Sequence, residues 1–181
     1  MYETIIERIK ERLESRDLKA VIIPHISPDG DAAGSCSALW QVLDRVGIQA
    51  QLMTCDYIPD YLKWLKRIPD AISFQNRPKE CKHWLHQADI LFMLDHNTVA
   101  REGDLEPFVK EFEGEVIMID HHPDPDDVTY RISDISVSST CELLYNVITE
   151  IWGKEVIDTD IAEAKEGQLR MPGLESFFTE I

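Results

Sequence analysis

The chain has 181 residues, of which 44% are hydrophobic, a composition that supports one large folded domain or one with a small second domain. The formal net charge is −16, which excludes a protein that coats long nucleic acid through a basic face. The apolar runs are too short for a membrane span, and the charged region 1–17 is unlike a secretory signal. The cysteines, Cys36, Cys55, Cys81 and Cys141, form no C-x-x-C pair. We therefore expect reduced thiols in a cytoplasmic protein without a membrane partner.

Hydrophobic periodicity and turn residues predict helices that alternate with short apolar strands. The predicted helices span residues 3–14, 32–46, 60–66, 78–87, 105–113 and 139–152, and the predicted strands span residues 20–24, 49–53, 72–74, 90–95 and 115–120. Ser139 and Glu142 have the spacing of a capping box, and Asp158 is expected to cap a further helix. This order predicts an α/β fold, a mostly parallel β-sheet with helices on both faces in three Rossmann-like layers.

Three of the predicted strands are followed by aspartate and histidine, residue types that commonly bind metal ions in proteins. The residues that follow VIIP, ILFML and EVIMI are His25, Asp29 and Asp31, then Asp95, then Asp120, His121 and His122. Sites in open α/β sheets form outside the carboxyl ends of the strands, so these side chains are expected to converge on one crevice. Each motif alone is also typical of a turn or a helix cap, but the same chemistry at three strand ends favours a site.

Aspartate and histidine without thiolate favour ions such as Mn²⁺, Mg²⁺, Fe²⁺ or Zn²⁺. Gly30 allows a tight turn between Asp29 and Asp31, so that each could serve one of two ions with Asp95 shared between them. The helix near Gly34 and Ser35 is expected to direct free N–H groups at an anionic substrate. The segment PDPDD, residues 123–127, is expected to be a solvated acidic loop.

These residues carry a resemblance to a known family. PHISPDGDAAGS, LFMLDHNTVAR and VIMIDHHPDPDD resemble the first three motifs of the DHH phosphoesterases, over residues from about 20 to about 164. YIPDYLKWL, ADILFMLDHN and SSTCELLYNVI resemble the RecJ-like oligoribonucleases (nano-RNases) that also dephosphorylate 3′-phosphoadenosine 5′-phosphate (pAp). The resemblance implies a Mn²⁺-dependent phosphodiesterase or phosphatase that acts on short oligonucleotides or pAp through water activated by two metal ions, and it implies a homodimer.

The resemblance also implies a role for each matching residue. His25 and Asp29 would hold one ion, Asp31 and His121 would hold the other, and Asp95 would bridge the two. Asp120 would orient its histidine neighbours, and His122 would contact the phosphate and support charge in the transition state. Arg101 would contact phosphate or balance local charge, or else it is a surface arginine at a helix start.

The C-terminal part departs from the family pattern. The fourth family motif, Thr-Asp-Thr-Gly-like, supplies a further metal ligand, whereas no aspartate follows Asp160 here. We therefore expect a DHH catalytic domain over residues 1–155, a divergent or truncated tail over residues 156–181, and no DHHA1-type substrate-binding domain. Two alternatives to the nuclease or phosphatase stay open. One is a degenerate DHH domain that binds metal or nucleotide without turnover, and the other is a pyrophosphatase or polyphosphatase of the same family.

Overall fold

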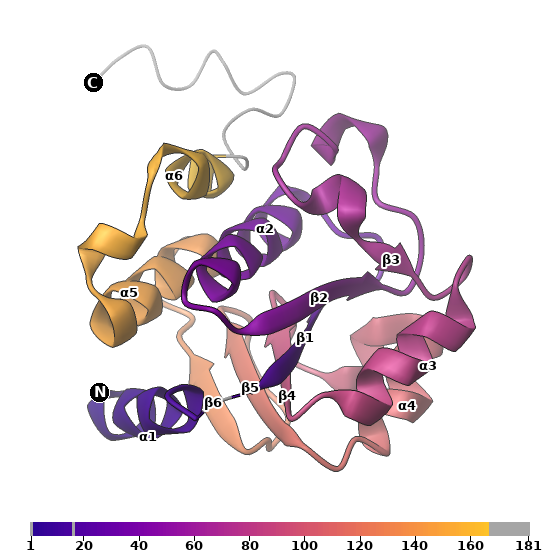
Figure 1. Cartoon of the computed structure of the whole chain (residues 1–181), viewed down its shortest axis with the longest axis horizontal. Helices are drawn as coiled ribbons and strands as arrows, with labels where there is room; N and C mark the ends of the chain where they lie inside the picture. The colour runs from indigo at the N-terminus through magenta and orange to yellow at the C-terminus, as the bar shows by residue number, and fades with distance from the viewer. Residues whose placement is uncertain (1, 16, 167–181) are drawn as a thin grey trace.

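The centre of the molecule is a six-stranded sheet in the order β3-β2-β1-β4-β5-β6, in which every neighbouring pair is parallel (Figure 1). The computed structural model describes residues 2–15 and 17–166. The strands are β1 (Lys19–Pro24), β2 (Gln49–Thr54), β3 (Ile72–Ser73), β4 (Ile90–Leu94), β5 (Glu115–Asp120) and β6 (Tyr130–Ser133). The parallel sheet predicted from the sequence is confirmed.

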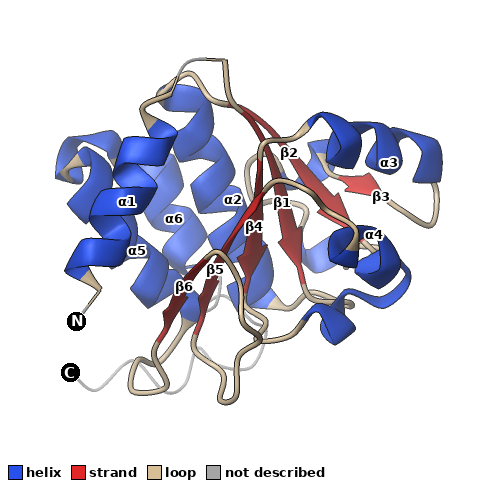
Figure 2. Cartoon of the chain, turned by 90° about the horizontal axis from the view of Figure 1, so that it is seen from below, coloured by secondary structure: helices blue, strands red, loops and turns tan. Residues whose placement is uncertain are grey.

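Helices cover both faces of this sheet, as predicted. They are α1 (Glu3–Leu13), α2 (Gly30–Arg45), α3 (Pro78–Gln87), α4 (Glu106–Lys110), α5 (Thr140–Trp152) and α6 (Thr159–Glu166). Figure 2 shows α1, α2, α5 and α6 on one side of the strands and α3 and α4 on the other. Short 3₁₀ segments span Asp60–Leu62, Ile68–Asp70, Val99–Leu105 and Lys154–Val156.

Alternate residues of each central strand fill two separate apolar layers. Ile22 of β1 and Phe92 of β4 pack in the layer under α1, α2 and α5, whereas Val21 and Met93 pack in the layer under α3 and α4. Both faces of a parallel sheet are buried in this way, so its strands are continuous apolar runs rather than alternating ones. The run ILFML of β4 is accordingly buried at every position.

Two helix starts follow the predicted capping chemistry. The Ser139 hydroxyl accepts a hydrogen bond from the Glu142 amide at 3.1 Å, and the Glu142 carboxylate accepts from the amide and hydroxyl of Ser138. The Asp158 carboxylate accepts from the Ile161 amide at 3.1 Å and so caps α6. Of the divergent or truncated tail predicted over residues 156–181, residues 167–181 lie outside the described residues.

Three local predictions were wrong, and one strand was missed. Helix α2 begins at Gly30 rather than at residue 32, because the Asp29 side chain already accepts from the amides of Asp31 and Ala32. The predicted helix 105–113 is only the shorter α4, Glu106–Lys110, and it is preceded by the 3₁₀ segment Val99–Leu105, in which Gly103 is non-helical. The predicted helix 60–66 is a single 3₁₀ turn over Asp60–Leu62. Strand β6 was not predicted, because its four residues follow an acidic loop and show little periodicity.

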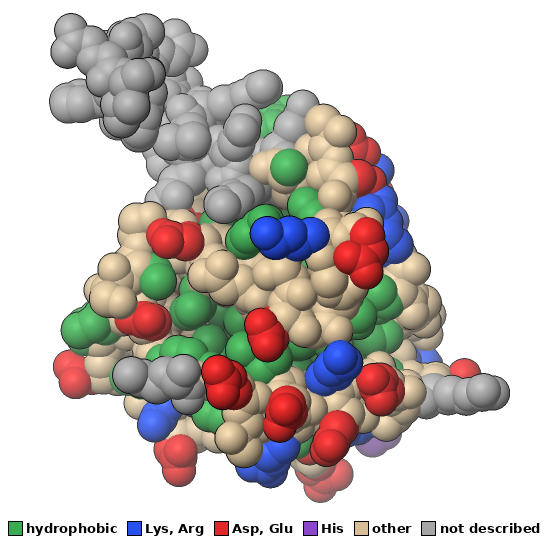
Figure 3. All heavy atoms as spheres, turned by 90° about the vertical axis from the view of Figure 1, so that its left-hand side faces the viewer, with side chains coloured by type: hydrophobic (Ala, Val, Ile, Leu, Met, Phe, Trp, Pro, Cys, Tyr) green, Lys and Arg blue, Asp and Glu red, His purple; other side chains and the backbone are tan. Residues whose placement is uncertain are grey.

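Acidic side chains on the outer surface agree with the net charge of −16. Figure 3 shows the side on which α1, α5 and α6 lie, where acidic side chains are scattered among apolar ones. Among the described helices, none is both long enough and apolar enough to span a membrane.

The strand order has one switch point, between β1 and β4. From β1 the chain adds β2 and β3 in one direction, and it then returns to add β4, β5 and β6 on the opposite side of β1. Open α/β sheets form a crevice at the carboxyl ends of the two strands at such a point. Here that crevice lies beyond Pro24 and Leu94, which are aligned in the sheet.

Gly103 is predicted to tolerate no side chain, because its φ is +58° and a Cβ there would lie 2.7 Å from Cys55 Sγ and 2.9 Å from Ile26 Cδ1. Gly47 is the matched control, with a φ of +83° and nothing within 4 Å of its Cβ position. A backbone conformation with positive φ costs an alanine about 1–3 kcal/mol, and the clash at Gly103 adds about 1–3 kcal/mol. Urea unfolding should therefore show a clearly larger loss of stability for Gly103→Ala than for Gly47→Ala. Equal losses would contradict the packing described.

Candidate metal centre

The centre of the candidate site is Asp95, the first residue after β4. The residue is 2% exposed, and its backbone has a φ of +62°. One carboxylate oxygen lies 3.7 Å from His25 Nε2, and the other lies 3.7 Å from His121 Nε2. His25 follows β1 and His121 follows β5, the two neighbours of β4 in the sheet. The convergence of three strand ends predicted from the sequence is therefore present.

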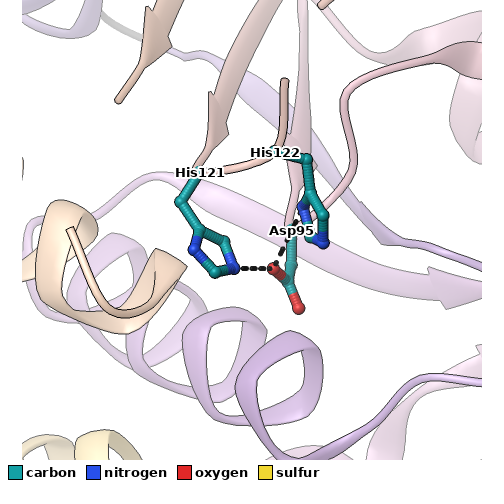
Figure 4. A group of neighbouring side chains, drawn as sticks. All are labelled: Asp95, His121 and His122. Carbon is teal, nitrogen blue, oxygen red and sulfur yellow. Dashed lines mark ion pairs between the residues drawn. The ribbon is translucent and has the colours of Figure 1, made fainter. Parts of the chain in front are cut away.

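Two groups of side chains within the described residues could each hold a metal ion. One group is His25, Asp29 and Asp95, and the other is Asp95, His121 and His122, with the ligand atoms of each within 4.8 Å of one another. Figure 4 shows the second group, in which both histidines face the Asp95 carboxylate. These oxygen and nitrogen donors suit hard or borderline divalent cations. Asp95 belongs to both groups.

The hydrogen bonding of His25 fits a metal ligand. Its Nδ1 lies 2.7 Å from the Ile26 carbonyl oxygen, which can only accept, so Nδ1 carries a proton and the lone pair of the neutral ring is on Nε2. Metal-binding histidines commonly donate their second ring N–H to such an acceptor. Burial lowers the pKa of His25, but its contacts with Asp95 and Ile26 raise it by more. A cation at Nε2 would replace the proton that Asp95 otherwise attracts.

Asp31 connects α2 to the start of α5. Its two carboxylate oxygens accept from the backbone amides of Thr140, at 2.8 Å, and Cys141, at 2.9 Å. One of these oxygens lies 3.8 Å from His121 Nε2. Burial raises the pKa of Asp31, and the nearby charge of Asp95 raises it further. The predicted role of Asp31 as a ligand beside His121 stays a prediction.

Asp120 and His122 form a closely bonded pair. Asp120 is fully buried at the end of β5, and its oxygens accept from the His122 backbone amide at 2.8 Å and from His122 Nδ1 at 2.7 Å. The His122 ring is therefore held in one orientation, with its Nε2 left unbonded by Asp120. The positioning role of Asp120 and the contact of His122 with phosphate both stay predictions.

Arg101 lies beside the cluster. Its carbonyl oxygen accepts from the Ile26 amide at 2.7 Å, and the charge of its guanidinium lowers the pKa of His25. Across the part of the chain that the structure describes, no carboxylate forms an ion pair with Arg101. Its predicted contact with phosphate stays a prediction.

The expected anion seat at Gly34 and Ser35 does not match their positions. Both residues are buried inside α2, because this helix begins earlier than predicted. The Ser35 hydroxyl donates to the Ala32 carbonyl oxygen at 3.1 Å, and the first free amides of the helix donate to Asp29 instead. The prediction that these two residues bind substrate is therefore corrected.

Sequence reasoning missed two contacts that shape the site. The buried Thr140 hydroxyl donates to Asp95 Oδ1 at 2.9 Å, although the sequence pattern indicated only a place at a helix start for Thr140. Asp126, expected to be solvated, accepts from the Val99 amide at 2.9 Å and so fixes the loop after His122 to the segment after β4. Neither contact has a local sequence signal, because each joins segments far apart in the chain.

Comparison with known proteins places the chain in a family. Residues 19–165 match the model of the DHH family, N-terminal domain. The chain belongs to this family, whose members are phosphoesterases. No curated protein matches the chain significantly.

Solved structures share the fold of this chain. An exopolyphosphatase-related protein from Bacteroides fragilis is 31% identical, with a TM-score of 0.88 over 91% of this chain, and the chain spans about half, 48%, of that protein. RecJ from Thermus thermophilus, in complex with Mn²⁺, is 15% identical, with a TM-score of 0.55 over 92% of this chain and 23% of RecJ. A second exonuclease RecJ, bound to manganese, is 14% identical, with a TM-score of 0.55 over 92% of this chain and 42% of that one. The likeness to RecJ shows the fold.

The raised pKa of Asp31 predicts the pH dependence of stability in metal-free protein. The folded state binds the Asp31 proton more tightly than the unfolded state does, so the contribution of Asp31 to stability falls as pH rises from the ordinary carboxyl pKa through the raised one. The slope for one group is at most about 1.4 kcal/mol per pH unit. Asp31→Asn lacks this slope. It also loses one carboxylate oxygen that accepts a backbone N–H, and this loss lowers the free energy of unfolding by an amount that does not vary with pH.

Urea unfolding between pH 4 and 7 in the presence of a chelator would measure this slope. Asp31→Asn should become progressively more stable relative to the wild type as pH rises. The exposed Asp127→Asn should follow the wild-type curve at a constant difference. A constant difference for Asp31→Asn as well would show that burial and Asp95 do not perturb Asp31.

Proposed function

We propose that this chain carries the catalytic centre of a metal-dependent phosphoesterase that hydrolyses short oligonucleotides or pAp. The observation that carries this proposal is the position of Asp95, one buried carboxylate that belongs to two separate ligand groups at the switch point of the sheet. A carboxylate shared in this way is what a two-metal phosphoesterase requires. Membership of the DHH family supports the reaction class.

In this proposal His25 and Asp29 hold one ion with Asp95, while His121 holds a second with Asp95 and the adjacent Asp31. The two RecJ structures that contain manganese support Mn²⁺ as the ion. When bound, such ions would acidify an attacking water and neutralise charge on the phosphoryl oxygens. Without them, the buried carboxylates of Asp31 and Asp95 repel each other.

The side chains around the cluster would orient and stabilise the phosphate. Asp120 holds His122 through Nδ1, so a proton on Nε2 would be stabilised by the Asp120 carboxylate and could be donated to a phosphoryl oxygen. Arg101, without an ion pair among the described residues, would bring a second positive charge near His25. An N–H donor on His122 and the guanidinium of Arg101, beside a shared metal-binding carboxylate, suit a phosphoryl group with developing negative charge.

A second candidate function is hydrolysis of pyrophosphate or polyphosphate. The 31% identity to an exopolyphosphatase-related protein favours it, and the metal centre would be the same. The segments that resemble nano-RNases favour the nucleotide substrates. Because the chain spans about half of that relative, binding of metal or nucleotide without turnover is a third outcome of the test. Cytoplasmic location and a homodimer stay predictions.

Hydrolysis by the purified chain with Mn²⁺ tests these alternatives directly. A dinucleotide, pAp and tripolyphosphate would be offered separately, and released mononucleotide or inorganic phosphate would be measured. We expect hydrolysis of the two nucleotides, complete loss with a chelator, and a loss of at least about 100-fold for Asp95→Asn. The exposed Asp127→Asn is the matched control and should keep full activity.

Two other outcomes would each assign one of the alternative functions. Hydrolysis of tripolyphosphate alone would assign the second candidate function. Bound Mn²⁺ without any product would assign binding without turnover. Full activity of Asp95→Asn would contradict the proposed centre.

A further inference from the structure

A buried histidine and a buried glutamate form a hydrogen-bonded pair next to Asp95 in the chain. His96 follows Asp95, Glu102 lies in the 3₁₀ segment Val99–Leu105, and both side chains are 0% exposed. His96 Nδ1 lies 2.9 Å from the Leu94 carbonyl oxygen, and His96 Nε2 lies 2.9 Å from Glu102 Oε1. We name this chain of contacts, from Leu94 through His96 to Glu102, the 94–96–102 clamp. The proposed reaction uses none of its side chains.

The contacts of the clamp fix its protons. The Leu94 carbonyl oxygen only accepts, so His96 Nδ1 must carry a proton. The contact between His96 Nε2 and Glu102 Oε1 then requires one further proton, carried either by the ring or by the carboxyl group. Burial raises the pKa of Glu102, against the opposing effect of His96, so the surroundings favour keeping this proton.

The clamp encloses Asp95, because the contact between His96 Nδ1 and the Leu94 carbonyl oxygen joins the two residues that flank it. The φ of Asp95, +62°, is left-handed, a conformation that residues other than glycine rarely adopt. Such outliers persist only where the surrounding structure holds them. The bond from His96 to Leu94 closes the chain around this turn, while the Asp95 amide donates to the Ile119 carbonyl oxygen at 3.2 Å.

The far end of the clamp is anchored to the neighbouring strands. The carbonyl oxygen of Arg101 accepts from the Ile26 amide at 2.7 Å, just beyond β1, and the Asp104 amide donates to Cys55 Sγ at 3.1 Å, just beyond β2. Glu102 lies between these two attachments. Its Oε2 is buried and has no hydrogen-bond partner within the described residues, so packing alone gives no reason for a carboxyl group here.

We propose that His96 and Glu102 are positioning residues that hold the left-handed backbone of Asp95 and thereby set its carboxylate between the two ligand groups. They act through Asp95, because among the described residues the hydrogen bonds and ion pair of these two side chains reach only Leu94 and each other, and no candidate ligand atom. The backbone part of this inference stands on the geometry alone, whereas its consequence for metal binding rests on the proposed function.

Two substitutions of Glu102 separate positioning from packing. Glu102→Leu fills the space but cannot bond to His96. Glu102→Gln can donate its amide N–H to His96 Nε2 while Nδ1 keeps its proton, so it should restore the clamp. His96→Phe keeps the volume of the ring and removes both contacts, and it serves as the second disrupting variant if Glu102→Leu does not fold. Leu85→Ala, in the apolar layer under α3, is the control for a general loss of stability.

The first measurement needs no metal. Amide hydrogen exchange followed by NMR would compare the Asp95 amide with the amides of β4, Ile90–Leu94, in the same sample. We expect the Asp95 amide to exchange at least about 10-fold faster, relative to β4, in Glu102→Leu and His96→Phe. In Glu102→Gln and Leu85→Ala the ratio should equal that of the wild type. An unchanged ratio in both disrupting variants would overturn the clamp.

The second measurement is calorimetric titration with Mn²⁺. We expect affinity to fall by about 10–100-fold in Glu102→Leu and His96→Phe, to return to within about threefold in Glu102→Gln, and to be unaffected in Leu85→Ala. Wild-type affinity in the disrupting variants would overturn the role in metal binding. If the wild type bound no Mn²⁺, the proposed function would fail, and the exchange ratio would still decide whether the clamp holds Asp95.

Discussion

The structure depends on one electrostatic constraint, the concentration of negative charge where the fold buries the carboxylates of Asp95 and Asp31. Asp95 and Asp31 are both buried, and the charge of the first raises the pKa of the second. Burying like charges is costly unless positive charge or hydrogen-bond donors compensate for them. The fold supplies three backbone or hydroxyl donors from the start of α5, and three histidines surround the carboxylates. A cation is the remaining partner that this arrangement can accept.

The arrangement follows from the topology of the sheet. Parallel strands place their carboxyl ends at one edge, and the reversal of strand order between β1 and β4 opens that edge. The site is then completed by elements that do not belong to the central strands. The start of α5 binds Asp31, and the segment Val99–Leu105 is attached to the residues after β1 and β2. The candidate ligands therefore come mainly from the strand ends, and α5 and the 99–105 segment hold the surrounding backbone and carboxylates in place.

The sequence could predict those features that depend on local pattern. Continuous apolar runs indicated buried parallel strands, and side chains such as His25 and Asp95 had to share an edge once the strands were parallel. The caps at Ser139 and Asp158 were predicted for the same reason, because a cap involves neighbouring residues. Contacts between distant segments could not be predicted. Thr140 reaches Asp95 across 45 residues, and the pairing of His96 with Glu102 depends on a left-handed residue and a broken 3₁₀ segment.

The placement of Gly34 and Ser35 illustrates the same limit. An error of two residues in a helix start moved both from an expected binding surface into the helix interior. The central claim, that Asp95 is shared between two cation sites, is tested most directly by anomalous diffraction from crystals grown with Mn²⁺. We predict two manganese peaks, one on each side of the Asp95 carboxylate, with His25 beside the first and His121 beside the second. No peak at this carboxylate, or manganese bound only elsewhere, would contradict it.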